Sequence, residues 1–281
     1  METLPLTGKT ILVTRSAGQS SQFTELLTNV GATVIEMPAL EIVAPSSWEG
    51  LDNTIANLST FDWLILTSSN AVNYFFDRLI AQGKDISNLG NMKIAVLGEK
   101  TALSLKKKHL QPDFIPPNFV ADSLVEKFPE NLPGKKIFFP RVESGGREVL
   151  VKEFTAKGAE VIEVAAYQSS CPSSFPSEAK LALQKRTVDV ITFGSSKTVK
   201  FFCQLLEKRF NTSTLLDVKN GEKNLEQVVK NYLQGVCIAS IGPQTSKSCS
   251  SLIGRVDVEA KEYTLDGLTQ ALIQWSDSVN K

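Results

Sequence analysis

The stretch KTILVTR (residues 9–15), followed by GATVIE (31–36), decides the fold because the chain spells both segments twice. KKIFFPR (135–141) lies 126 residues after the first segment, and GAEVIE (158–163) lies 127 residues after the second. Between the first two segments, apolar residues recur at the i, i+3, i+4, i+7 spacing of a helix with one buried face. Strand, helix and strand in this order predict a βαβ unit, and therefore a parallel sheet with right-handed crossovers.

Two further pairs of segments repeat in the same order. DWLILTSSNAVNYF (62–75) returns as DVITFGSSKTVKFF (189–202), and IAVLGEKT (94–101) returns as IASIGPQT (238–245). We name the three repeated segments blocks A, B and C, where block A is the βαβ unit. A repeat of this length indicates two similar domains, because solenoid repeats span only about 20–50 residues. A chain of 281 residues is ordinarily long enough for two domains.

Composition and charge limit the classes of partner. Apolar residues make up 42% of the chain and charged residues 21%, as in a soluble globular protein. The 30 basic and 30 acidic residues cancel, so nothing in the overall charge indicates a nucleic acid or an anionic membrane as a partner. The four cysteines show no CxxC spacing, which favours reduced thiols in a cytoplasmic protein over a metal site. METLPLTGKT (1–10) lacks the features of a signal peptide, and no apolar run reaches the length of a membrane span.

The repeated polar residues follow the predicted strands. In a parallel α/β sheet, ligands bind beyond the carboxyl ends of the strands, where loops lead into helix N-termini. Free N–H groups and the helix dipole favour anions there by about 0.3–1 kcal/mol each, which suits a polycarboxylate or a polyphosphate. Any single Ser or Thr is ordinarily only a helix cap, and duplicated caps would recur as well. The repeated residues are Arg15 and Arg141, Ser68 and Ser195, and Thr101 and Thr245.

Tyr167 is the candidate acid. The chain has no GxSxG, GxxxxGK[ST], GxGxxG or HExxH motif, and its only histidine, His109, follows a predicted helix end and is expected on the surface. A phenol has a pKa near about 10 and can donate a hydrogen bond at neutral pH. Tyr167 ends VIEVAAY (161–167) at the start of a linker, which favours a role in a cleft over that of a rim aromatic.

Taken together, the motifs resemble those of the uroporphyrinogen-III synthase family over nearly the whole chain. They are KTILVTR…GATVIEMPALE, FDWLILTSSNAV, IAVLGEKTA, FFPR…GGREVL…GAEVIEVAAYQ, ITFGSSKTV and IASIGPQTS…DGLTQAL. The resemblance implies an α/β fold of two similar parallel-sheet, flavodoxin-like domains joined by a two-stranded β ladder. One domain would combine residues 1–38 with 169–281, the other would span 42–165, and the linkers 38–45 and 164–170 would pair. Block A of each half would then pack with blocks B and C of the opposite half, whereas the repeat alone suggests a contiguous split near Leu132.

The reaction implied by the resemblance is the cyclisation of hydroxymethylbilane with loss of water and inversion of ring D, through an azafulvene and a spiro intermediate, without a cofactor or metal. Tyr167 matches the tyrosine proposed to assist loss of the hydroxyl, and we expect Thr245 to be the second catalytic residue. The expected partners are this linear tetrapyrrole and, transiently, hydroxymethylbilane synthase; we expect a monomer. The predicted substrate-binding residues are Arg15, Ser68, Ser69, Thr101, Arg141, Arg147, Ser195 and Ser196.

Two other functions stay open at this point. A non-catalytic two-domain binder of an anionic metabolite, similar in outline to periplasmic binding proteins, would leave VIEVAAYQ (161–168) unexplained and would need a signal peptide. A glycosyl or phosphoryl transferase would need a nucleotide-binding motif. Two local expectations complete the prediction: a strand at 255–260, and an extra helix and mobile loop within 207–235, which has no counterpart in the first half.

Overall fold

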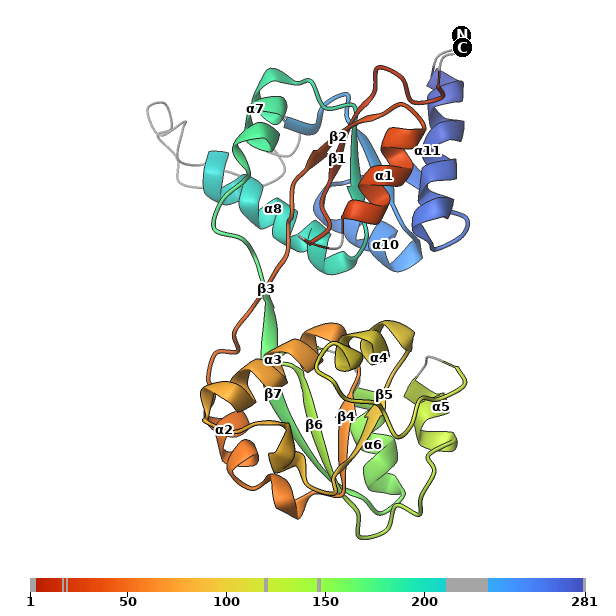
Figure 1. The fold of residues 1–281 in the computed structure, drawn as a ribbon. Coiled ribbons are helices and arrows are strands. Elements are labelled where there is room, and N and C mark those ends of the chain that lie inside the picture. Colours follow the sequence, from red (N-terminus) through yellow and green to blue (C-terminus); the bar gives the residue numbers. More distant parts are fainter. Residues whose placement is uncertain are drawn as a thin grey trace. The chain divides into compact units, whose positions relative to one another are not determined.

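The chain divides into two compact units in a computed structural model that describes residues 4–16, 18, 20–118, 121–145, 148–210 and 232–279. Unit 1 consists of Met1–Glu41 with Ser170–Lys281, and unit 2 consists of Ile42–Ser169. Each unit is a twisted sheet with helices on both faces (Figure 1). The sheets therefore bury both of their faces, which explains why the strands at residues 63–66, 190–193 and 237–240 are buried at every position.

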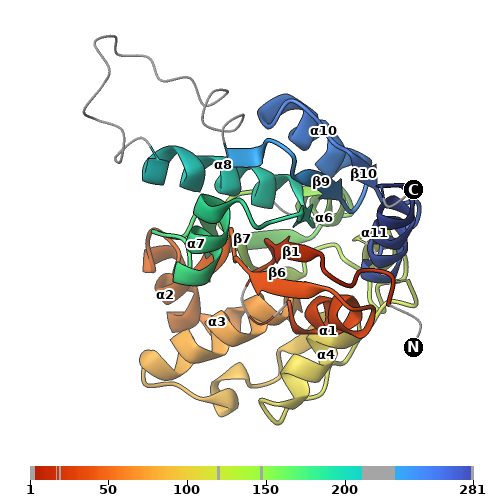
Figure 2. The ribbon, with the colours of Figure 1, turned by 90° about the horizontal axis from the view of Figure 1, so that it is seen from above.

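Unit 1 contains a five-stranded sheet in the order β10-β9-β8-β1-β2, and all its recorded strand pairs are parallel. Helices α7, α8 and α10 pack on one face and α1 and α11 on the other; α8 and α10 lie side by side (Figures 1 and 2). The strands are β1 (Thr10–Val13), β2 (Thr33–Glu36), β8 (Val190–Phe193), β9 (Cys237–Ser240) and β10 (Val258–Glu259), and the helices are α1 (Ser21–Asn29), α7 (Ser177–Lys185), α8 (Ser196–Phe210), α10 (Pro243–Leu252) and α11 (Leu265–Val279).

Unit 2 contains a five-stranded sheet in the order β3-β7-β6-β4-β5. Helices α2, α3 and α4 pack on one face and α5 and α6 on the other. The strands are β3 (Glu41–Val43), β4 (Trp63–Leu66), β5 (Lys93–Val96), β6 (Lys136–Val142) and β7 (Glu160–Ser170); the helices are α2 (Glu49–Ala56), α3 (Ser69–Ala81), α4 (Glu99–Lys106), α5 (Ala121–Glu126) and α6 (Glu148–Ala156), with 3-10 turns at Leu58–Thr60 and Ile86–Leu89.

Strand pairing is interleaved between the two halves of the sequence. In unit 1, β1 of the first block A pairs with β8 of the second block B. In unit 2, β6 of the second block A pairs with β4 of the first block B. The contiguous split near Leu132 that the repeat alone suggests is therefore wrong: a βαβ unit from one half completes the sheet that strands of the other half begin.

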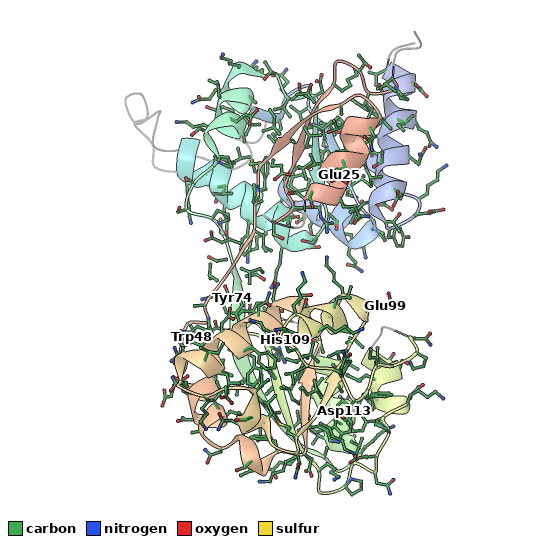
Figure 3. All side chains as sticks on the ribbon, in the orientation of Figure 1. Glu25, Trp48, Tyr74, Glu99, His109 and Asp113 are labelled. Carbon is green, nitrogen blue, oxygen red and sulfur yellow. The ribbon has the colours of Figure 1, made fainter. Side chains whose placement is uncertain are left out.

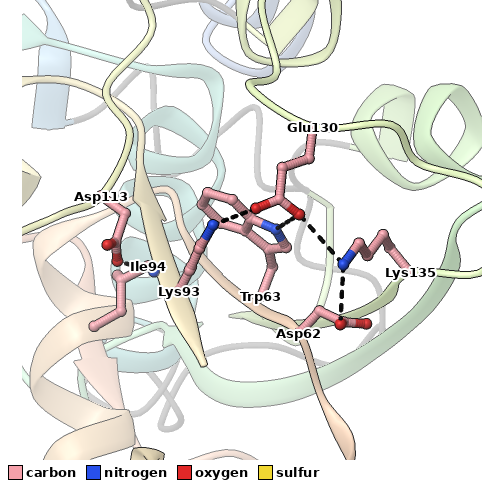
Figure 4. Close-up of polar contacts among 7 residues, drawn as sticks. All are labelled: Asp62, Trp63, Lys93, Ile94, Asp113, Glu130 and Lys135. Carbon is pink, nitrogen blue, oxygen red and sulfur yellow. Dashed lines mark hydrogen bonds and ion pairs between the residues drawn. The ribbon is translucent and has the colours of Figure 1, made fainter. Parts of the chain in front are cut away.

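The repeat also carries a structural device at the amino ends of the strands. An aspartate at the start of each block B strand accepts a hydrogen bond from a backbone N–H of block A, and a second aspartate does the same for the first residues of block C. Both devices occur in both units, so these carboxylates serve the fold and leave the carboxyl ends of the strands for a site. The pairs are Asp62–Lys136, Asp189–Thr10, Asp113–Ile94 (Figure 4) and Asp257–Ile238, with Oδ2···N distances of 2.7–2.8 Å.

The predicted strand at 255–260 is shorter than expected, since β10 is only Val258–Glu259. Arg255 lies outside this strand, and its guanidinium donates to the carbonyls of Leu233 and Val236, at 2.6 and 2.7 Å. The predicted extra helix and loop lie largely outside the described residues. Within the described part of the chain, no helix is long and apolar enough to span a membrane.

Candidate active site

Tyr167 lies at an irregularity in β7. Arg141 on β6 is opposite Ala165, but the next residue, Val142, is opposite Tyr167, so Ala166 is an extra residue in the ladder. The backbone carbonyl of Tyr167 accepts a hydrogen bond of 2.8 Å from the N–H of Glu143. Such a bulge bends its strand and re-aims the side chains beside it. Both Ala166 and Tyr167 consequently pack into the core under α2, α3 and α4.

The hydroxyl of Tyr167 meets a serine that caps a helix. Its oxygen lies 3.0 Å from Oγ of Ser68, and the Tyr167 side chain is largely buried. Ser68 is the extended N-cap residue of α3, and its Oγ accepts a hydrogen bond of 3.0 Å from the N–H of Ala71. Two residues of the predicted site, Tyr167 and Ser68, are thus in direct contact, and their hydroxyls form a pair that can donate to an oxygen developing negative charge.

Arg15 and Ser195 line a pocket in unit 1. They follow β1 and β8, which are adjacent parallel strands, so their loops meet at the same edge of the sheet. The pocket has a volume of about 140 Å³ and is lined by Arg15, Ser16, Leu40, Gly194, Ser195 and Thr198. A Cβ atom on Gly194 would lie 3.2 Å from a guanidinium nitrogen of Arg15, so the glycine allows the arginine to approach the backbone closely. Burial lowers the pKa of Arg15, but a guanidinium stays charged at neutral pH and suits a carboxylate.

Arg141, which corresponds to Arg15 in the repeat, is already engaged. Its guanidinium pairs with the carboxylate of Glu163 and donates to the carbonyls of Gly145 at 2.9 Å and Val142 at 3.3 Å. A ligand would have to compete with Glu163 for this group. Arg147, another predicted substrate-binding residue, lies outside the described residues.

The other predicted residues have structural contacts. The hydroxyl of Ser69 donates to the carbonyl of Lys100 at 3.2 Å, and that of Ser196 donates to the carbonyl of Gln244 at 3.0 Å, so each fastens one helix start to the next. Thr101 is 4% exposed and its hydroxyl donates to the carbonyl of Leu97 at 3.3 Å, while Thr245 is 5% exposed. Tyr167 belongs to unit 2 and Thr245 to unit 1. The roles of Ser69, Ser196, Thr101 and Thr245 toward a ligand stay predictions.

Sequence reasoning missed a row of side chains beside Tyr167. Tyr74 and Trp48, which lie close together in unit 2 (Figure 3), stack in succession on its ring. The sequence feature that could have indicated this row is the spacing of four residues between Tyr74 and Arg78, which places both side chains on one face of α3. His109 is exposed, as expected. Among the described residues, no group of three or more His, Cys, Asp or Glu side chains could hold a metal ion.

A larger pocket lies at the opposite edge of the unit 2 sheet. Its volume is about 530 Å³, and it contains two lysines and two carboxylates. Lys93 and Lys135 both pair with Glu130, and Lys135 also pairs with Asp62 at 3.3 Å (Figure 4). These charges satisfy one another at the amino ends of the strands, away from Tyr167, so we do not assign the active site to this pocket.

Comparison with known proteins identifies the family. The family model described as uroporphyrinogen-III synthase HemD matches residues 21–270. The chain belongs to the uroporphyrinogen-III synthase family. It is 50% identical to the uroporphyrinogen-III synthase of Synechococcus elongatus over 272 residues, which cover 97% of each chain.

Solved structures of synthases share the fold. The uroporphyrinogen-III synthetase of Helicobacter pylori has a TM-score of 0.57 and 16% identity, over 95% of this chain and 99% of its own. A mutant uroporphyrinogen III synthase of Thermus thermophilus has a TM-score of 0.53 and 16% identity, over 96% and 99%. At these identities the likeness concerns the fold alone, and it agrees with the predicted α/β class with parallel sheets.

Proposed function

We propose that this protein is a uroporphyrinogen-III synthase, a lyase that closes hydroxymethylbilane to uroporphyrinogen III with loss of water and inversion of ring D. The observation that carries the proposal is the 50% identity to a synthase over 97% of both chains. The alternative of a non-catalytic anion binder is not favoured, because a family model for the synthases accounts for residues 21–270.

Tyr167 is proposed to assist the departure of the substrate hydroxyl. The C–O bond breaks as the electron pair of the pyrrole nitrogen moves toward the ring, and the leaving oxygen takes a proton from Tyr167 to depart as water. The resulting azafulvenium loses its N–H proton to give the neutral azafulvene, and return of that proton to the Tyr167 phenolate balances the step. Tyr167 is a suitable donor because a phenol is protonated at neutral pH. Its contact with Ser68, at 3.0 Å, supports the role by fixing where the phenol hydroxyl lies. Thr245 is retained as the second proposed catalytic residue.

The pocket around Arg15 is proposed to hold a carboxylate of the substrate. Hydroxymethylbilane carries eight carboxylates on its acetate and propionate groups. The guanidinium of Arg15 and the hydroxyls of Ser195 and Thr198 offer charged and neutral donors in a single small pocket. Binding the chain in a bent conformation would bring its reacting ends together, which can supply much of the rate enhancement without a cofactor.

The finer organisation belongs to the same proposal. The two units would be similar flavodoxin-like domains, joined by a two-stranded β ladder of residues 38–45 and 164–170. The sheet order supports this ladder because β3 is the neighbour of β7. We also propose that the enzyme is a cytoplasmic monomer that meets hydroxymethylbilane synthase transiently and binds neither nucleic acid nor a membrane; its balanced charge supports the last point.

The activity can be tested by supplying hydroxymethylbilane freshly generated by its own synthase. The porphyrinogen products are oxidised, and the type I and type III isomers are separated by chromatography. Predominantly type III product is the expected result. Type I alone, the product of unassisted closure, would refute the proposal and favour the binding protein.

A further inference from the structure

A row of stacked side chains leads from Tyr167 to an ion pair. The ring centroid of Tyr74 lies 5.8 Å from that of Tyr167, with 29° between the planes, and the ring of Trp48 lies 6.5 Å beyond, at 27°. Cζ of Arg78 lies 4.7 Å from the centroid of the Trp48 ring. Arg78 in turn donates from Nε and a terminal nitrogen to the two carboxylate oxygens of Asp52, at 2.6 and 2.5 Å. We call these five residues the aromatic row.

Tyr74 is the middle one of the three stacked rings, and both its backbone and its hydroxyl are held in place. Its backbone belongs to α3, whose N-cap Ser68 contacts the hydroxyl of Tyr167. Its own hydroxyl donates to the carbonyl of Ile42 on β3 at 3.0 Å. Burial raises the pKa of Tyr74, so this hydroxyl remains a donor over the neutral pH range. A ring fixed in this way leaves the stacked ring of Tyr167 little freedom to rotate.

The corresponding positions in unit 1 show that the scaffold does not need this row. The offset of 127 that aligns the two B blocks also aligns α3 with α8, and each buried position of α3 has a buried counterpart in α8. At the positions that match Tyr167, Tyr74 and Arg78, unit 1 has only apolar residues, and it forms the same kind of sheet and helix layers. The matches are Leu40 for Tyr167, Phe201 for Tyr74 and Leu205 for Arg78. The fold therefore forms without the aromatic row, which occurs in the unit that contains Tyr167.

We infer that Tyr74 is a positioning residue, whose ring holds Tyr167 so that its hydroxyl stays on Ser68 and points at the leaving group. The inference rests on the proposed function. Stacking between aromatic rings fixes their relative planes, and an error of about 1 Å in the placement of a catalytic group can cost about a hundredfold in rate. Tyr74 itself need not contact the substrate, so its replacement should lower kcat and leave KM unchanged.

The test compares kcat and KM for type III formation in Tyr74→Leu, Tyr74→Phe and a control. Phe61→Leu is the matched control, because Phe61 also loses an aromatic contact in unit 2, to Phe138 at 5.5 Å, but lies before β4 at the opposite edge of the sheet. We expect Tyr74→Leu to lower kcat about tenfold with KM unchanged. Tyr74→Phe keeps the stacked ring and should recover most of the rate. Phe61→Leu should leave kcat unchanged.

A double-mutant cycle separates positioning from mere stability. If Tyr74 acts through Tyr167, Tyr74→Leu should slow the Tyr167→Phe enzyme no further, whereas independent effects would multiply. If Tyr74→Leu does not fold, Trp48→Leu removes the outer support of Tyr74 and should lower kcat about threefold, again at constant KM.

Several results would overturn the inference while leaving the proposed function intact. They are a kcat for Tyr74→Leu equal to that of Phe61→Leu, losses that multiply with Tyr167→Phe, or a rise in KM alone. A wild-type enzyme that forms only type I product would instead refute the proposed function, so the two failures are distinguishable.

Discussion

The two units place different residues on the same scaffold. In unit 1, Leu40 shares a pocket with Arg15 and Ser195. In unit 2, the residue that corresponds to Leu40 is Tyr167, which contacts Ser68, while the corresponding arginine, Arg141, is engaged by Glu163. One copy thus has an arginine and a leucine at a pocket without carboxylates, and the other has a phenol together with an arginine whose pocket also contains two carboxylates. With the proposed roles, unit 1 would bind a carboxylate and unit 2 would supply the proton donor, while the four strands of blocks A, B and C keep the same order in both sheets.

A second difference lies behind the helices of block C. In unit 1, Ser240 and Ser246 are buried with their oxygens 2.6 Å apart, and Ser246 donates to Glu259. The corresponding residues of unit 2 are Val96 and Ala102, which belong to an apolar core. Both solutions satisfy the rule that buried polar groups are paired. Unit 1 therefore keeps a buried polar cluster next to Thr245, where unit 2 has only apolar side chains.

The largest expected effect is that of Tyr167→Phe. A positioned proton donor contributes about 10²–10⁴-fold to a rate, so we expect at least about a hundredfold lower rate of type III formation. His109→Ala should have no effect, because His109 is exposed beyond the end of α4. Initial rates measure both variants, and circular dichroism checks their folding. Comparable losses of rate in the two variants, with the fold intact, would contradict the role proposed for Tyr167.

The two corresponding arginines should differ in their effect on affinity. Arg15→Gln removes a cation from a pocket and should raise KM at least about tenfold, as expected for loss of a charge-assisted hydrogen bond worth about 1.5–3 kcal/mol. Arg141→Gln should raise KM less, because the carboxylates of Glu143 and Glu163 line the pocket beside Arg141 and disfavour an anion there, whereas the lining of the pocket around Arg15 includes no carboxylate. Steady-state kinetics of both variants tests the comparison. An equal rise in KM would mean that both arginines meet the substrate.

The two capping serines should have equal structural effects and different functional ones. Ser68 and Ser195 each accept a hydrogen bond from a backbone N–H of the following helix, at Ala71 and Thr198. Replacement of either by Ala should cost about 1 kcal/mol of stability, or about 2–4 °C in Tm. Only Ser68→Ala should lower kcat, since Ser68 contacts Tyr167; Ser195→Ala should act on KM. Calorimetry measures Tm, and steady-state kinetics measures kcat and KM. A fall in kcat for both variants would contradict the different roles proposed for Ser68 and Ser195.

The smallest effect concerns thiols, which report on unit 1 alone because all four cysteines belong to it. Burial raises the pKa of Cys203, Cys237 and Cys249 to about 12 each, so these thiols stay protonated at pH 8. We expect Ellman's reagent to label only the half-buried Cys171 rapidly in the native protein, and all four thiols after denaturation. Two or more rapidly labelled thiols would contradict the packing of unit 1.

The same pKa shifts predict how stability depends on pH. The pKa of each buried thiol is higher in the folded chain than its ordinary value of 9.0, so the unfolded chain loses its thiol protons first as pH rises. The free energy of unfolding should therefore be unaffected by these thiols below about pH 8 and fall as pH rises from about 9 toward 12. Urea denaturation at a series of pH values measures this fall.

The sequence predicted the α/β class and the family for identifiable reasons. The repeats of KTILVTR and GATVIE are strands and helix stops whose periodicity is local, so they can be recognised without tertiary contacts. The repeated Ser-Ser pairs were also recognised, but their contacts with Lys100 and Gln244 were not, since hydrogen bonds between neighbouring helices have no signature in one segment. Arg141 was given the same role as Arg15 because the repeat does not show that Glu163 reaches its guanidinium.

By itself, the sequence determined the duplicated βαβ blocks, the polar residues that follow each strand, and the relationship to the synthases. Tertiary structure decided which block pairs with which, that a bulge at Ala166 re-aims Tyr167, and that Tyr74 and Trp48 stack beside it. The physical reason is the range of the interactions. Strand and helix patterns arise from neighbours within a few residues, whereas contacts such as that between Ser68 and Tyr167 join residues 99 positions apart, and only the folded chain brings them together.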